Sequence, residues 1–190
     1  GDANSIQACY DCAVGTNNKG ITITASKSPL PVRTTLAQTQ EALETGTITL
    51  QETPGEKTVV FAVVGDMMLL PVFEATAALA QAGIGSKIVA IVSPRRLYRS
   101  SDVAWENCRD GDDTFLSDAA FATLFDGDAL MGITGGSSAM LEPVMLRSTA
   151  PRDVMAWKRG ETTASAAKLM AFNGLTTEAI VARSKTLLLG

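Results

Sequence analysis

The stretch from Lys57 to Gly83, KTVVFAVVGDMMLLPVFEATAALAQAG, constrains the fold more than any other. It opens with an unbroken apolar run, Val59 to Val64, and a run this short and this apolar predicts a strand that is covered on both faces. Beyond this run, apolar and small residues recur at helical spacing. They predict a helix with one buried stripe, formed by Val72, Ala75, Thr76 and Leu79.

The position of Pro71 fixes the start of this helix. Proline is tolerated only near the first helical turn, so we expect the helix to begin close to Met67–Leu70 and to end at Gly83. A second apolar run follows at Lys87 to Val92. Strand, helix and strand in this order predict a right-handed crossover between two parallel neighbours.

The remaining patterns extend this α/β alternation in both directions. We predict a linker at Glu52–Lys57, where Pro54-Gly55 interrupts the pattern, and so divide the chain into an arm, residues 1–56, and an α/β domain, residues 57–190. Residues 1–20 show no clear periodicity. Further strands are predicted at Ile21–Ala25, Ile48–Leu50, Ala129–Thr134 and Asp153–Trp157, and further helices at Thr35–Glu44, Asp118–Phe125, Ser138–Leu146 (shortened or kinked by Pro143), Ala166–Ala171 and Thr176–Leu188.

Composition excludes several classes of function. The net charge of −4 and the 5% aromatic content leave nothing to neutralise phosphates or stack on bases, so nucleic-acid binding is not expected. No apolar run approaches the ~20 residues of a membrane span. Three cysteines make no disulfide framework in a chain of 190 residues, and we expect a cytoplasmic protein. The chain contains no histidine, which excludes Ser-His-Asp and Cys-His nucleophiles and histidine-based zinc sites within it.

Two motifs have a functional and a structural interpretation. Cys9 and Cys12 have C-x-x-C spacing, but a redox pair needs a helix start after a strand, and a zinc site needs two further ligands where only Cys108 remains. We therefore favour ordinary thiols in an irregular arm. Gly135-Gly136-Ser137-Ser138 at a helix start can hold an anion, yet the same residues satisfy close packing and capping, and no lysine follows as in a phosphate-binding loop.

Three further segments carry charged side chains in a turn or directly after a predicted strand. Asp126-Gly127-Asp128 has the first half of a magnesium-binding pattern without a suitably placed asparagine, so a turn is the better interpretation. Lys27 follows directly on a predicted strand and can reach a phosphate as a point charge. The polar loop of Lys158, Arg159, Glu161, Thr162 and Thr163 lies beyond a strand end, where it can line a crevice or cap the next helix.

Four segments together resemble the last domain of phosphoketolases. The final segment also resembles the closing motif of transketolases. From Gly20 onward the four matches keep the family's order and spacing over most of the chain. The segments are ITITASKSPLP at Ile21–Pro31, FLSDAAFATLF at Phe115–Phe125, WKRGETT at Trp157–Thr163, and AFNGLTTEAIV at Ala171–Val181.

This resemblance implies a fold and an enzyme. The fold is a three-layer α/β domain with an open, mixed, mostly parallel sheet of about five strands and helices on both faces. The parent enzyme uses thiamine diphosphate and magnesium, held by the preceding domains, to cleave xylulose 5-phosphate or fructose 6-phosphate with phosphate into acetyl phosphate. The domain itself then binds no cofactor or metal, has no catalytic residue, and supports a homodimer. Lys27 matches a lysine placed near the substrate phosphate.

Two departures leave the subfamily open. Gly111–Thr114 replaces a segment that usually contains histidine, and Glu161 and Ala164 interrupt the threonine-rich loop. The alternatives are the C-terminal domain of a transketolase or a related thiamine-dependent enzyme, and a freestanding module that binds a small anion near Gly135–Ser138.

Overall fold

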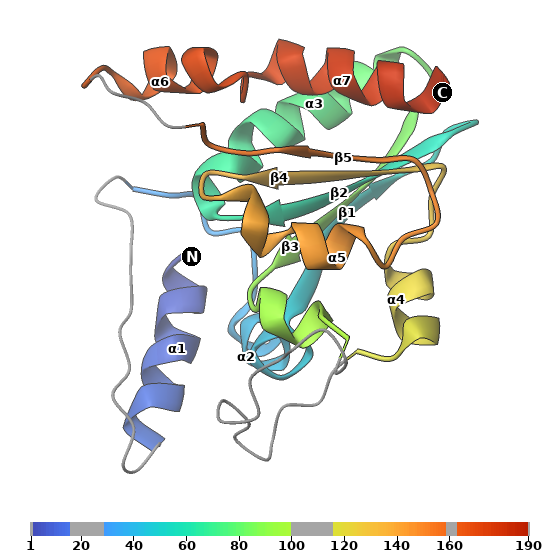
Figure 1. Ribbon diagram of the computed structural model, residues 1–190. Helices are drawn as coiled ribbons and strands as arrows, with labels where there is room; N and C mark the ends of the chain where they lie inside the picture. The colour runs from blue at the N-terminus through green and yellow to red at the C-terminus, as the bar shows by residue number, and fades with distance from the viewer. Residues whose placement is uncertain (1, 16–28, 100–115, 159–162, 190) are drawn as a thin grey trace.

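The protein is a five-stranded α/β sheet with helices on both faces, seen in a computed structural model (Figure 1). The structure describes residues 2–15, 29–99, 116–158 and 163–189. The sheet order is β1-β3-β2-β4-β5; β1 runs antiparallel to β3, and the other neighbours are parallel. The predicted fold class is therefore confirmed. The strands are β1 (Thr47–Thr53), β2 (Thr58–Val64), β3 (Gly85–Ile91), β4 (Ala129–Thr134) and β5 (Arg152–Met155).

The two central strands are the most deeply buried part of the chain. In β2 the side chains from Val59 to Val63 are at most 1% exposed, and every residue of β4 is buried. Phe61 pairs in register with Ile88 of β3 on one side and Met131 of β4 on the other. Both strands occupy the positions predicted from their unbroken apolar runs, because a central parallel strand is covered on both faces.

Helix α3 (Leu69–Gln81) connects β2 to β3 as the predicted crossover. A short 3₁₀ turn, η1 (Asp66–Met68), precedes it. The predicted stripe of Val72, Ala75, Thr76 and Leu79 is buried, and Pro71 lies in the first turn. Gly83 follows the helix at φ +73°, a backbone conformation that glycine adopts without strain.

Separate apolar clusters cover the two faces of the sheet (Figure 1). On one face α3 and α7 (Thr177–Leu189) pack over Phe61, Ile88 and Met131. On the other face η2 (Pro94–Leu97), α4 (Asp118–Leu124) and α5 (Glu142–Met145) pack over Val60 and Leu130. Successive side chains of a β-strand point to opposite faces of the sheet, so alternate residues of β2 belong to the two clusters.

The segment predicted as an arm contributes to this sheet. Helix α2 (Leu36–Thr45) begins with the expected capping box of Thr35 and Gln38, and ends at Gly46 in the left-handed conformation. Strand β1 follows at once and forms the antiparallel edge of the sheet against β3. The turn at 54–57 then leads into β2.

The prediction that the first 20 residues are irregular was wrong for the part that the structure describes. Ala3–Gly15 form helix α1, which carries Cys9 and Cys12 inside a helix rather than in a loop. The Asp2 side chain accepts a hydrogen bond from the Ser5 backbone N–H at 2.9 Å, which is the contact of an N-cap. Only Ala8 of this helix is buried, so apolar periodicity did not reveal it.

The segment after β4 forms two short helical turns in place of one helix, as the position of Pro143 predicted. A 3₁₀ turn, η5 (Ser138–Met140), and the short α5 replace the single helix predicted through Leu146, with Pro143 at the start of α5. The chain then runs through β5, α6 (Ala166–Asn173) and α7. Among the described helices none is long and apolar enough to cross a membrane.

Candidate functional site

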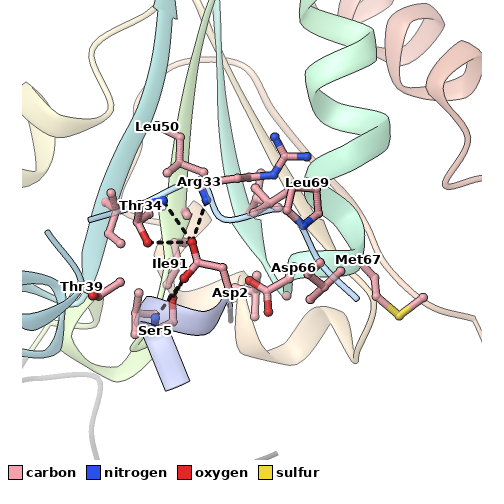
Figure 2. A pocket seen from close by; sticks show the side chains of 18 of the residues that line it. Asp2, Ser5, Arg33, Thr34, Thr39, Leu50, Asp66, Met67, Leu69 and Ile91 are labelled. Carbon is pink, nitrogen blue, oxygen red and sulfur yellow. Dashed lines mark hydrogen bonds between the residues drawn. The ribbon is translucent and has the colours of Figure 1, made fainter. Parts of the chain in front are cut away.

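A pocket of about 470 Å³ lies where β2 and β3 end and α3 begins. Helix α1 and the segment 29–34 close it from the other side (Figure 2). The carboxyl ends of parallel strands are the usual location of ligand sites in open α/β sheets. Its size falls within the range of small-molecule sites, roughly 300–1,000 Å³.

Most of the wall is aliphatic. The sheet contributes Ile48, Leu50, Val63, Ala90 and Ile91, and these side chains come from three different strands. Others come from the rim, where Met67 is 56% and Leu70 57% exposed. The apolar lining includes, besides these, Leu30, Leu43, Leu69 and Val92.

A buried carboxylate fixes the position of α1 at this pocket. One oxygen of Asp2 accepts hydrogen bonds from the backbone N–H groups of Arg33 (2.8 Å) and Thr34 (3.0 Å) and from the Thr34 hydroxyl (2.9 Å). The other accepts from the backbone N–H and hydroxyl of Ser5, both at 2.9 Å. Figure 2 shows these bonds converging on Asp2. They join the start of α1 to a segment about 30 residues later in the sequence.

These donors determine the charge of Asp2. Burial alone would raise the pKa of its carboxyl, but the hydrogen bonds from Arg33, Ser5 and Thr34 outweigh it and hold the pKa well below its usual range. Asp2 is therefore an anion whose acceptor positions are already used. It is a structural group of the pocket wall and not a proton donor or acceptor for a reaction.

Arg33 brings a positive charge to the same pocket. Its guanidinium carbon lies 4.3 Å from the centroid of the Phe73 ring, a cation–π contact. The residue is half-buried, and in the described part of the chain its guanidinium has no ion pair. Figure 2 shows the side chain extending towards the start of α3, near Leu69.

The space between the carboxyl ends of β2 and β4, a second usual location for a ligand, is filled by a side chain. The chain turns from β2 and from β4 onto opposite faces of the sheet, and ligands commonly bind between two such strand ends. Here Met68, which is 2% exposed, occupies that space. Its side-chain atoms lie 3.6–3.9 Å from where a Cβ on Gly135 would be. The open pocket consequently lies at β2 and β3 instead.

The glycine-serine segment at the end of β4 is engaged in its own contacts. The Gly136 N–H donates to the Thr134 hydroxyl at 3.0 Å, and the Ala139 N–H donates to the Ser137 hydroxyl at 3.3 Å. The Ser138 hydroxyl donates to the Glu142 carboxylate at 2.7 Å. A carboxylate at this position opposes the binding of an anion.

The Asp126-Gly127-Asp128 segment is a turn, as predicted, and its contacts are those of a structural turn. The Asp128 carboxylate accepts from the Thr58 backbone N–H at 2.7 Å. A Cβ on Gly127 would lie 2.6 Å from Val60, so the turn packs directly on β2. Among the described residues no three His, Cys, Asp or Glu side chains gather as a metal site would require.

Most of the other predicted site residues lie outside the described part of the chain. These are Lys27, Cys108, Arg159, Glu161 and Thr162. Lys158 and Thr163 are described and both are exposed. The Lys158 backbone N–H donates to the buried amide of Asn173 at 2.6 Å, and that amide donates to the Leu169 carbonyl at 2.8 Å. Asn173 thereby fixes where this loop leaves the sheet.

The two described cysteines differ in their surroundings. Cys9 is half-buried and lines the pocket, whereas Cys12 is exposed. Both lie inside the helix, whereas a redox pair requires the start of a helix.

Comparison with known proteins shows the fold. No protein-family profile and no curated protein matches the sequence. A variant of Pichia stipitis transketolase in complex with fructose 6-phosphate matches the structure with a TM-score of 0.69 and 13% identity, over 99% of this chain and 24% of that chain. The Campylobacter jejuni transketolase gives 0.54 and 13%, over 76% and 19%. A split-gene transketolase described as an inactive β4 tetramer gives 0.58 and 17%, over 86% and 48%.

This chain has a transketolase-type fold. It spans between 19% and 48% of the length of these chains, so it corresponds to one part of each. Their identity to this chain, 13–17%, is low enough that the likeness concerns the fold alone.

Sequence reasoning missed the pocket itself. Its walls come from α1, the segment 29–34, α2 and the ends of three strands, which are far apart in the sequence. Asp2 and Arg33 carried no motif. The available signals were an aspartate placed to cap a helix and a single arginine just before the capping box at Thr35.

Proposed function

We propose that this chain is the C-terminal domain of a cytoplasmic thiamine-diphosphate-dependent enzyme, of the phosphoketolase type. In this proposal the preceding domains hold thiamine diphosphate and magnesium. The parent enzyme cleaves xylulose 5-phosphate or fructose 6-phosphate with inorganic phosphate and releases acetyl phosphate. The domain described here has no catalytic residue; it supports a homodimer and the architecture on the substrate side.

The observation that carries the proposal is the transketolase-type fold over 99% of the chain. The ordered segments that resemble phosphoketolases, from Ile21 to Val181, favour that subfamily. The absence of histidine from the whole sequence also supports a non-catalytic part, because acid–base chemistry at neutral pH most often uses histidine.

Two parts of the chain face the substrate side in this proposal. Lys27 contacts the phosphate of the sugar, and the loop formed by Lys158, Arg159, Glu161, Thr162 and Thr163 lines the crevice or the domain interface. In the complete enzyme we expect Lys27→Met to raise KM for the sugar phosphate with little change in kcat, since it removes binding common to the ground and transition states. Lys168→Met, on the exposed surface of α6, is the matched control.

The experiment that tests the proposal compares the isolated chain with the complete parent enzyme. The isolated chain should release no acetyl phosphate from either sugar phosphate, and titration with thiamine diphosphate and magnesium should give no heat. The complete enzyme should release acetyl phosphate in proportion to the inorganic phosphate consumed. Turnover by the isolated chain, or cofactor bound entirely within it, would contradict the proposal.

Transketolase is the second candidate, and the fold likeness supports it equally. The same complete enzyme distinguishes the two, because a transketolase transfers a two-carbon unit to an aldose phosphate without consuming phosphate. The freestanding anion-binding module is a weaker alternative, since Ser137 and Ser138 are already hydrogen-bonded and Glu142 lies beside them.

A further inference from the structure

We infer that the pocket at the ends of β2 and β3 binds a small monocarboxylate with an apolar body, its carboxylate on Arg33 and its chain among the aliphatic side chains. This inference goes beyond the proposed function and does not depend on it. It rests on three features of the pocket: its size and lining, the state of Arg33, and the other charges on its wall.

The lining selects an apolar body. Three strands, α2 and α3 contribute aliphatic side chains to a pocket of about 470 Å³. A largely apolar concavity of this size with a few polar groups is the usual form of a small-molecule site. Leu43 and Leu50 are half-buried, which leaves apolar surface for a ligand to cover.

Arg33 selects an anionic head group. Its guanidinium has no ion pair in the described residues and is held over the Phe73 ring at 4.3 Å. Stacking on an aromatic face leaves the in-plane N–H donors free to form two parallel hydrogen bonds with a carboxylate. The backbone N–H of Arg33 already donates to Asp2, so the segment that carries the guanidinium is fixed before a ligand arrives.

The neighbouring charges limit the ligand to a single negative charge. Asp2 also lines the pocket and is held in its ionised form by its hydrogen bonds. Its negative charge opposes phosphate esters and dicarboxylates more strongly than it opposes a ligand with one negative charge. A monocarboxylate brings one charge, which Arg33 compensates.

Calorimetric titration of the intact chain with hexanoate tests the inference. Hexanamide has the same chain without the charge, and inorganic phosphate has charge without a chain. We expect saturable binding of hexanoate, much weaker binding of hexanamide, and no competition from phosphate. Arg33→Met should weaken hexanoate binding by about tenfold or more, the loss expected for a charge-assisted pair of hydrogen bonds.

Two further variants separate binding from folding. Arg152→Met removes an exposed arginine at the opposite edge of the sheet and should bind hexanoate like the parent protein. Ala90→Leu adds bulk to the pocket wall without changing charge and should also weaken binding. Each variant is first shown to melt cooperatively. No hexanoate binding, equal binding by Arg33→Met, equal binding of hexanamide, or displacement by phosphate would each overturn the inference.

Discussion

Arg147 places a guanidinium inside the protein, with only 1% of its side chain exposed. Its two terminal nitrogens donate to the carbonyls of Leu97 (2.6 Å) and Leu116 (2.8 Å) and to the Asp118 carboxylate (2.8 Å). The group also stacks on Phe121 at 4.4 Å. One side chain thus holds together the end of η2, the start of α4 and the turn after α5 that carries Arg147.

Replacing Arg147 should destabilise the fold. Arg147→Met keeps an apolar chain against Phe121 but donates no hydrogen bond, so two carbonyls lose their partner at about 1–3 kcal/mol each. We expect the free energy of unfolding, measured by urea titration, to fall by about 2–6 kcal/mol. Arg152→Met, on an exposed arginine, should change it by less than about 0.5 kcal/mol. An unchanged midpoint in Arg147→Met would show that water replaces the guanidinium.

The stability of α1 docking depends on pH through the carboxyl group of Asp2. Its pKa in the folded protein lies below the unfolded value of 3.8. Such a carboxyl stabilises the folded state above the unfolded pKa, and the contribution is lost as pH falls below that value towards the folded pKa.

Asp2→Asn should therefore flatten this acid dependence. We expect the wild-type midpoint in urea to fall between about pH 5 and pH 2 more steeply than that of Asp2→Asn, since only the wild type must protonate this carboxylate. Asp126→Asn removes an exposed carboxyl from a turn and is the matched control. Parallel pH profiles of the wild type and Asp2→Asn would contradict the assigned role of Asp2.

At the scale of elements, the turn between β1 and β2 crosses the start of β3 with almost no space between the backbones. A Cβ built on Gly85 would lie 2.7 Å from the Gly55 nitrogen and 2.9 Å from the Thr53 carbonyl oxygen. Both contacts are to backbone, which moves less easily than a side chain. Glycine at this position lets the edge strand turn back into the centre of the sheet.

Gly85→Ala should disturb this crossing. Because the added methyl must displace backbone, we expect thermal and urea unfolding to report a loss of about 3 kcal/mol. Gly15→Ala is the control: nothing lies within 4 Å of the site on α1, and alanine favours a helix. A Gly85→Ala protein as stable as the parent would mean that the β1–β2 turn relaxes at no cost.

Elements whose own sequence pattern reflects their burial could be predicted. β4 is buried along its whole length and was predicted with its observed ends, and α3 was predicted from its stripe and Pro71. Helix α1 was missed because it buries only Ala8 and depends on a cap whose donors, Arg33 and Thr34, lie far along the chain. Ile6, Tyr10 and Val14, spaced four apart, were the signal available in the sequence.

The candidate site was not predicted from the sequence, although the fold class indicates the edge of the sheet on which it lies. In open α/β sheets ligands usually bind at the carboxyl ends of the strands, and the pocket lies at that edge. Which pair of strand ends stays open depends on Met68 filling one crevice, a packing outcome that no local pattern shows. The pairing of Arg33 with Phe73 is equally a product of tertiary structure.

For the whole molecule, burial is distributed very unevenly. The centre of the sheet is closed on both faces by apolar clusters. Helix α1 lies outside both clusters, packed beside α2 (Figure 1). Its residues Ile6, Tyr10 and Val14 are 40%, 59% and 68% exposed. A helix of 13 residues with so little tertiary packing has little stability of its own.

We therefore expect α1 to open without the rest of the protein. In hydrogen exchange followed by mass spectrometry, amides of α1 should exchange first and show little dependence on low urea concentrations, as local opening does. Amides of β2 and β4 should exchange last and follow global unfolding. Asp2→Asn should accelerate exchange in α1, because it weakens the contacts that hold the start of this helix. If α1 instead exchanged together with β4, the two would form one cooperative unit, and the contacts through Asp2 would contribute more than its burial suggests.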